Sequence, residues 1–379
     1  MAVGIICEYN PFHNGHIYHL EKVKEIAKDE PIILVMSGNF TQRGNISIIE
    51  KYDKAKIALD YGIDLVVELP FEFATQSSDF FAKGSIKLLN ELKCNKLIFG
   101  SESNNVDELI NLANIQLNNK KYNSLVKEEL DKGINYPTAM SNALKKISKS
   151  TITTPNDLLG LSYIKEIIKN KYEIEPITIK RTNDYNSKEL TDSISSASSI
   201  REALKNNQDI STTLPKKSLN RIIKYDENKY FELLKYKIIS DKDLSIYQTV
   251  DEGIDNKLKK EIYKSNNIDE LINNIKSKRY TYNKISRMLT HIICSFTKED
   301  NKKNTEISYI KILGFSNKGK EYLNKIKKKI DIPIITNINK NNISLLELDI
   351  KTDSIYNLLT NKNDNIFKKK PIIKDIVKK

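Results

Sequence analysis

Three of the four histidines in this 379-residue chain fall within seven positions, at His13, His16 and His19. They follow the apolar run Ala2–Cys7 and open a stretch with helical periodicity. Gly15, between the first two, lets a backbone come close to a ligand. Backbone N–H groups at a helix N-terminus face an anion, and imidazoles add hydrogen-bond donors. The cluster therefore predicts a phosphate-binding site.

Metal binding is the competing interpretation, because the His-x-x-His spacing occurs twice in this segment. No cysteine cluster or additional acidic ligand accompanies the histidines, so we predict no metal site. The three cysteines, Cys7, Cys94 and Cys294, share no metal or redox spacing. They are typical of reduced thiols in a cytoplasmic protein.

The elements that would position the histidines alternate between short apolar runs and helical stretches. Such alternation predicts an α/β fold, in which a parallel sheet carries helices on both faces. Ligands of such sheets bind beyond the carboxyl ends of the strands, so we expect the site in the loops that follow them. The predicted strands are Ala2–Cys7, Pro31–Met36, Asp64–Leu69, Lys96–Phe99 and Glu173–Lys180.

Charge divides the chain unevenly. Lys and Arg number 62 and Asp and Glu 49, for a net charge of +13. Residues 1–210 hold 26 basic and 28 acidic side chains, whereas residues 211–379 hold 36 and 21. A basic region is the electrostatic footprint of nucleic-acid binding, although a general abundance of lysine is the simpler alternative. No apolar run is long enough for a membrane span, and the N-terminus does not have the pattern of a signal peptide.

The same division predicts two domains. Residues 1–210 form the α/β domain, and a boundary falls near 205–215, where a different helical pattern begins. Residues 211–379 are predicted to be a basic, mainly helical region with a small mixed terminal segment, which includes a strand-like run at Asp331–Asn337.

The segment His13-Asn14-Gly15-His16 after a first strand resembles the H-x-G-H signature of nucleotidyltransferases with a Rossmann-like fold. Their second motif, I-S-S-T-x-I-R, has an imperfect counterpart at 195–201. Ser195 replaces the Ile, Ala197 the second Ser and Ser198 the Thr, while Arg201 is retained. Further segments extend the resemblance, over nearly the whole chain, to bacterial tRNA(Met) cytidine acetate ligases. They include Met36–Gly44, Asp64–Pro70, Phe99–Glu102, Pro155–Gly160, Arg279–Thr281, Lys311–Phe315 and Leu348–Lys351.

The resemblance implies activation of acetate by ATP to acetyl-adenylate. It also implies transfer of the acetyl group to the N4 amine of the wobble cytidine in elongator tRNA(Met), which forms N4-acetylcytidine. Mg²⁺ would be bound with ATP, as phosphate and water are its preferred ligands. The alternative is a small-molecule adenylyltransferase of the same fold that makes a coenzyme precursor.

The same resemblance assigns roles to particular residues. His13 and His16 would be catalytic, and Ser198 and Arg201 are candidates for phosphate binding. The ATP site would comprise Ile6, Cys7, Glu8, Tyr9, Asn10, Pro11, Phe12, His13, Asn14, Gly15, His16, Ile17, Tyr18, His19, Gly100, Asn156 and Arg181.

Several of these residues have an alternative, structural interpretation. Glu8 could hold a cation, orient a neighbouring group or serve only as a helix-cap partner. Asn156 could cap the helix that follows Pro155, and Arg181 could be a solvated charge at a strand end. The polar loop 37–44 is either an ordinary connection or a substrate-side loop whose Arg43 meets an acidic group.

A basic, tyrosine-containing segment in the second half supplies the candidates for tRNA binding: Lys278, Arg279, Tyr280, Lys284 and Arg287. Cations contact phosphates, and a tyrosine ring stacks on an unpaired base. The alternative is a helix whose tyrosines pack in a core. We expect these side chains to lie away from the sheet edge at which ATP would react.

Overall fold

The computed structural model describes residues 1–148, 150, 152–181 and 195–374. Five parallel strands form the centre of its sheet in the order β5-β4-β1-β2-β3. The near-continuous apolar sequences of the first four strands in chain order are largely buried because helices cover both faces, whereas the fifth, at the edge of the sheet, is mostly half-buried or exposed. The strands are β1 (Val3–Cys7), β2 (Ile32–Ser37), β3 (Leu65–Leu69), β4 (Lys96–Ser101) and β5 (Glu175–Lys180).

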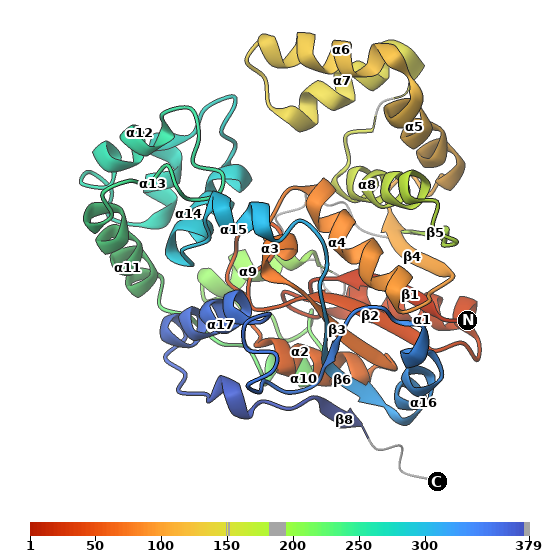
Figure 1. Ribbon diagram of the computed structural model, residues 1–379. Helices are drawn as coiled ribbons and strands as arrows, with labels where there is room; N and C mark the ends of the chain where they lie inside the picture. Colours follow the sequence, from red (N-terminus) through yellow and green to blue (C-terminus); the bar gives the residue numbers. More distant parts are fainter. Residues whose placement is uncertain (149, 151, 182–194, 375–379) are drawn as a thin grey trace.

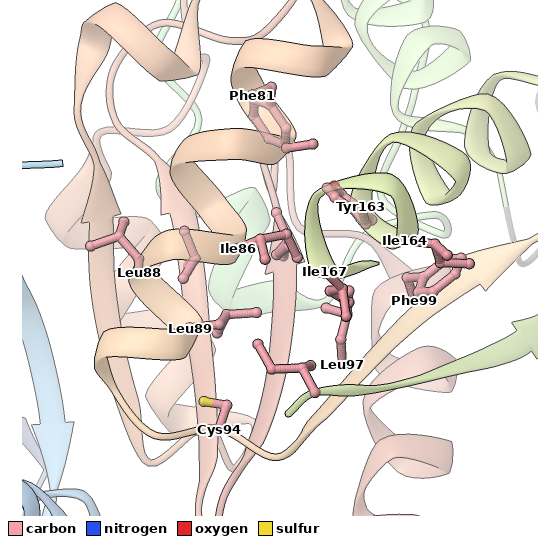
Figure 2. Packing of buried hydrophobic residues seen from close by; sticks show 14 of the residues in the cluster. Phe81, Ile86, Leu88, Leu89, Cys94, Leu97, Phe99, Tyr163, Ile164 and Ile167 are labelled. Carbon is pink, nitrogen blue, oxygen red and sulfur yellow. The ribbon is translucent and has the colours of Figure 1, made fainter. Parts of the chain in front are cut away.

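Alternate residues of β1, β2, β3 and β4 contribute to two separate cores. Val3 and Ile5 of β1 pack with α1 (Asn14–Ala27) and α2 (Lys51–Asp60). Residues of the opposite parity pack with α4 (Ser78–Glu91) and α8 (Pro155–Asn170) on the other face. Figure 2 shows side chains of these two helices meeting those of β4. The period of two along a strand therefore explains the three-layer arrangement.

Helices add two further regions to the sheet (Figure 1). The first follows β4 and contains α5 (Val106–Asn118), α6 (Lys120–Asp131) and α7 (Tyr136–Ser148). The second has its own apolar core, to which Leu234, Leu258, Leu271 and Met288 contribute. It comprises α11 (Glu227–Ser240), α12 (Ile254–Glu261), α13 (Ile268–Ile275), α14 (Tyr282–Ile293) and α15 (Lys298–Lys303). Between β5 and this region lie α9 (Ala197–Lys205) and α10 (Lys216–Leu219), which contribute to a separate, smaller apolar cluster.

The chain then returns to the first sheet. Strand β6 (Ile310–Ser316) pairs antiparallel with β3, and two short strands pair with β6. The predicted α/β class and the mainly helical, basic region after it are confirmed, but β6 was not predicted as part of the sheet. The boundary near residue 210 stays a prediction. The remaining elements are α3 (Phe71–Ala74), α16 (Asn317–Ile326), η1 (Lys327–Lys329), β7 (Ile334–Ile335), α17 (Glu347–Leu359), η2 (Ile366–Lys368) and β8 (Ile372–Lys374).

A buried cluster of charges joins this returning segment to the N-terminal strands. Lys51 Nζ of α2 lies 2.8 Å from Glu68 Oε1 of β3, and Lys311 Nζ of β6 lies 2.9 Å from Glu68 Oε2. Two carboxylates of α17 complete the cluster. Asp353 accepts from Lys51 and from Asn39 Nδ2, and Asp349 Oδ2 lies 3.4 Å from Lys311 Nζ. In the part of the chain that the structure describes, no helix is both long and apolar enough to cross a membrane.

Candidate active site

A cavity of about 880 Å³ opens at the carboxyl ends of β1, β4 and β5. The loop between β1 and α1 lines it, as do the loop after β2 and the N-termini of α4, α8 and α9. Helix α14, from the second half of the chain, forms another part of the wall. The cavity therefore lies at the sheet edge where ligands of parallel α/β sheets bind.

His13 and His16 are held by the N-terminal cap of α1. His13 is the N-cap residue, and its Nδ1 accepts from the backbone N–H of Gly15 at 3.1 Å. The backbone N–H of His13 donates to Nδ1 of His16, also at 3.1 Å. Since both Nδ1 atoms are acceptors, the proton of each neutral ring lies on Nε2. The ring centroids are 3.8 Å apart, so the fold holds two Nε2–H donors together in the cavity wall.

Burial keeps these imidazoles uncharged. Burial, together with the positive charge of Arg181, lowers the pKa of His13 to about 3 and the pKa of His19 to about 4. The pKa of His16 is well below its ordinary value for the same main reason, with a contribution from the neighbouring His13. Neutral rings of this kind suit hydrogen-bond donation to an anion rather than proton abstraction.

Acid should destabilise the protein because of these histidines. Their folded-state pKa values lie below the ordinary 6.5, so stability is fully present above pH 6.5 and is lost as pH falls towards 4. Glu72 acts in the opposite sense, because burial raises its pKa to about 8. The His13→Asn variant removes the contribution of one histidine. Its free energy of unfolding should therefore fall less between pH 7 and pH 5 than that of the wild-type protein. Urea denaturation at a series of pH values measures this, and identical profiles for variant and wild type would contradict it.

The wall formed by β4, β5 and α8 brings together three sequence-predicted residues. Arg181 Nε lies 3.6 Å from Glu102 Oε1, which also accepts from Asn156 Nδ2. A Cβ at Gly100 would lie 3.3 Å from Arg181 Cγ, so glycine leaves room for the arginine. Thr154 occupies the N-cap position of α8, so capping does not explain Asn156.

Residues 195–201, the second predicted motif, contact the loop that carries the histidine motif at the edge of the cavity. Ser196 is the N-cap of α9, and its Oγ accepts from the backbone N–H of Ser199 at 3.1 Å. Arg201 Nη1 donates to the carbonyl oxygen of Asn10 at 2.5 Å. Ser198 and Arg201 both line the cavity, so the two segments that resemble the motifs border one site.

Most of the residues assigned to ATP line this cavity, but four do not. Phe12 and Ile17 pack in the core beneath α1. Asn14 Nδ2 donates to the carbonyl oxygen of Thr212 at 2.9 Å. Pro11 is buried and is not part of the cavity wall. These four therefore support the loop rather than face the cavity.

Glu8 orients the loop that follows β2. Its Oε1 accepts from the backbone N–H of Gln42 at 2.6 Å. Beneath it, the buried Lys54 Nζ donates to the carbonyl oxygens of Glu8, Ser37 and Gly38 at 3.0, 2.9 and 2.7 Å. These bonds tie together the ends of β1 and β2. Of the alternatives for Glu8, orientation of a neighbouring group fits this geometry. The loop that Glu8 holds carries Arg43, which lies in the cavity wall.

The tRNA-binding candidates divide into two groups. Tyr280 is 5% exposed, its hydroxyl donates to the carbonyl oxygen of Asp251, and Lys284 Nζ lies 3.8 Å from its ring centroid. Stacking of Tyr280 on an unpaired base is therefore a wrong prediction, because the ring is already covered. Lys278 is exposed and lies outside the cavity.

The other three candidates, Arg279, Lys284 and Arg287, line the same cavity as the histidines. The expectation that they lie away from the sheet edge is wrong, because α14 packs directly on the loop after β2. Thr290 Oγ1 of α14 donates to the carbonyl oxygen of Gly44 at 2.6 Å. Contacts between segments this far apart in sequence leave no local pattern.

Sequence reasoning also missed the part of the wall contributed by α7. Tyr136 and Met140 of α7 line the cavity, as does Ile134 just before this helix. The i, i+4 spacing of Tyr136 and Met140 is that of an ordinary amphipathic helix, so no signal distinguished them. Among the described residues, no group of three or more His, Cys, Asp or Glu side chains could hold a metal ion.

A family model described as HIGH Nucleotidyl Transferase matches residues 1–370. With histidines at the N-terminus of α1 and a cavity at the carboxyl edge of a parallel sheet, the chain belongs to this nucleotidyl transferase family. It is 41% identical to tRNA(Met) cytidine acetate ligase of Clostridium acetobutylicum, with 96% of both chains covered. It is 39% identical to the ligase of that name from a Geobacillus species, over 94% of this chain and 91% of the relative.

A solved structure extends the comparison. The crystal structure of Thermotoga maritima TmcAL bound with alpha-thio ATP matches with a TM-score of 0.89 and 30% identity, and the match covers 99% of this chain and 100% of that chain. Within the nucleotidyl transferases, this chain belongs to the tRNA(Met) cytidine acetate ligase family. The family predicted from the motifs is confirmed.

Proposed function

We propose that this protein activates acetate with ATP and transfers the acetyl group to the N4 amine of the wobble cytidine of elongator tRNA(Met). The observation that carries the proposal is the pair of neutral imidazoles whose Nε2–H groups border a cavity also lined by Arg181 and Arg201. Such a site stabilises negative charge at a phosphate. Membership of the ligase family supports acetate and tRNA(Met) as the other substrates.

The reaction has two balanced steps. A carboxylate oxygen of acetate attacks the α-phosphorus of ATP, and the bond to the oxygen of the leaving pyrophosphate breaks. The cytidine N4 then attacks the acetyl carbonyl carbon, AMP leaves with the bridging oxygen, and the amine releases a proton to solvent. His13, His16 and Ser198 donate to phosphate oxygens, and the guanidinium groups of Arg181 and Arg201 balance charge.

The other proposed contacts follow from the cavity wall. The ATP site comprises the predicted residues that line the cavity, with Gly100 and Asn156 at the wall formed by β4 and α8. The tRNA contacts are the cations Lys278, Arg279, Lys284 and Arg287, with Tyr280 holding Lys284 in place. We place the protein in the cytoplasm, which agrees with three free cysteines.

The test is to supply ATP and acetate with and without tRNA, and to identify the nucleotide product. The proposal expects pyrophosphate and AMP, with acetate-dependent exchange of labelled pyrophosphate into ATP when tRNA is absent. ADP as the product would overturn it. The coenzyme-forming alternative would release pyrophosphate but keep AMP within its product.

The same assay tests how magnesium enters. We propose that Mg²⁺ arrives as part of the MgATP substrate and is held mainly by phosphate oxygens and water. Protein dialysed against a chelator should regain full activity when MgATP is added. Metal that stays tightly bound to the nucleotide-free protein through dialysis would contradict this.

A further inference from the structure

Two arginines from opposite halves of the chain lie in the cavity wall where the loop after β2 contacts α14. Arg43 belongs to the loop after β2, and Arg287 to α14. The loop and the helix touch at Gly44, whose φ is +79° and whose Cβ, if present, would lie 2.6 Å from the backbone N and Cα of Arg287. With the hydrogen bond from Thr290 to Gly44, this contact fixes the spacing between the two arginines.

The guanidinium of Arg287 lacks a counter-charge in the described part of the chain. Its Nε is buried without a hydrogen-bond partner there, and no ion pair to a carboxylate of the described residues is formed. Burial and the positive charge of Arg43 lower its pKa to about 10. The nearby Glu252 is already paired with Arg279 at 3.1 Å. The residue is half-buried, and a cation in this setting calls for an anion supplied by a ligand.

We propose that Arg43 and Arg287 bind the phosphodiester backbone beside the acceptor cytidine, and so hold the nucleotide whose base enters the cavity. This inference rests on the proposed function. A base that reacts inside a cavity must leave its neighbours in the strand, and its sugar and adjoining phosphates then pass along the wall. Arginine binds phosphate through paired N–H groups, which fixes orientation as well as affinity.

The charge distribution favours RNA phosphate over the triphosphate of ATP. The triphosphate is already matched by the imidazoles, Arg181 and Arg201, on the walls formed by α1, β5 and α9. Arg287 comes instead from the half of the chain that carries the excess of basic residues. Lys284, one turn before it, lines the same wall.

The test uses an RNA hairpin with the anticodon arm of tRNA(Met), in which a neutral methylphosphonate replaces a phosphate beside the acceptor cytidine. For the wild-type protein, the replacement should weaken binding about 10- to 100-fold, the range for loss of a charged hydrogen-bonded contact. The Arg287→Met variant should bind the unmodified hairpin as weakly as the wild-type protein binds the methylphosphonate hairpin. Introducing the methylphosphonate should weaken binding to this variant little further. The slope of its log binding constant against log salt concentration should decrease in magnitude by about 0.7–0.9.

Matched controls separate the outcomes. Arg43→Ala should behave as Arg287→Met does, whereas Lys264→Ala, an exposed cation outside the cavity, should keep the wild-type response. Acetate-dependent pyrophosphate exchange without RNA should stay near its wild-type rate in both arginine variants, which also shows that they are folded. If this exchange falls instead, the arginines serve the triphosphate and the inference is wrong.

Two outcomes with the wild-type protein distinguish an error in the phosphodiester site from an error in the proposed function. Wild-type protein that neither binds nor acetylates the hairpin refutes the proposed function itself. Wild-type protein that acetylates it, while the variants lose no affinity, refutes only the phosphodiester site. Arg287→Lys should restore part of the affinity, since it restores charge without the paired N–H groups.

Discussion

Replacing His13 by alanine should slow adenylate formation by about 10²–10³-fold, the cost of removing one preorganised donor from a developing negative charge. The Nε2–H of His13 is positioned before any substrate binds, because its Nδ1 is engaged by the backbone N–H of Gly15. The ring is neutral at physiological pH. Acetate-dependent pyrophosphate exchange measures this step without contribution from tRNA.

Alanine at this position also removes the N-cap of α1, so a control must keep the cap. Asn is among the best N-cap residues, and its side-chain oxygen can accept from the N–H of Gly15 as Nδ1 does. His13→Asn should therefore be as inactive as His13→Ala, while its free energy of unfolding exceeds that of the alanine variant by about 1 kcal/mol. An active His13→Asn protein would mean that the histidine serves only the helix.

Replacing Lys51 by methionine should lower the free energy of unfolding by about 3–5 kcal/mol, the cost of leaving a buried charge without its partner. Lys51 is 1% exposed and is shared between Glu68 and Asp353. Its loss leaves Lys311 as the cation facing the carboxylates of Glu68, Asp349 and Asp353. Urea denaturation of the full chain provides the measurement.

A second substitution tests whether charge or packing causes the loss. Asp353→Asn in the Lys51→Met background removes the excess negative charge and keeps an oxygen for Asn39 Nδ2. The double variant should recover a large part of the lost stability. A double variant no more stable than Lys51→Met would show that the cost comes from packing rather than from an uncompensated charge.

Much of the site follows from local sequence. The apolar run Val3–Cys7 and the glycine-containing histidine cluster after it are a strand, a turn and a helix start, which depend on neighbouring residues. Parallel strands end at a common edge, so the places of Gly100 and Arg181 at that edge could be predicted from the fourth and fifth strands, whereas their part in an ATP site came from the family resemblance and stays a prediction. The local sequence therefore predicts a phosphate-binding site and its place at this edge of the sheet.

The contacts that residues of the second half make in the folded chain could not be predicted from local sequence. The apolar run of β6 has the pattern of a strand, but nothing in it specifies antiparallel pairing with β3, more than 240 residues earlier. Tyr280 has the composition of a stacking residue and is buried instead. An apolar or aromatic pattern reports that a side chain can be buried and not which surface will bury it.

Local sequence patterns predict the alternating strands and helices, the histidine cluster at the start of the first helix and the separation of charge between the two halves of the chain. The folded chain alone brings α14 into the cavity wall, holds the loop after β2 through Glu8 and Lys54, and sets the half-buried Arg287 beside Arg43. Caps and periodicity act over a few residues along the chain. Packing between distant segments depends on the shape and charge of complete surfaces, which exist only after folding.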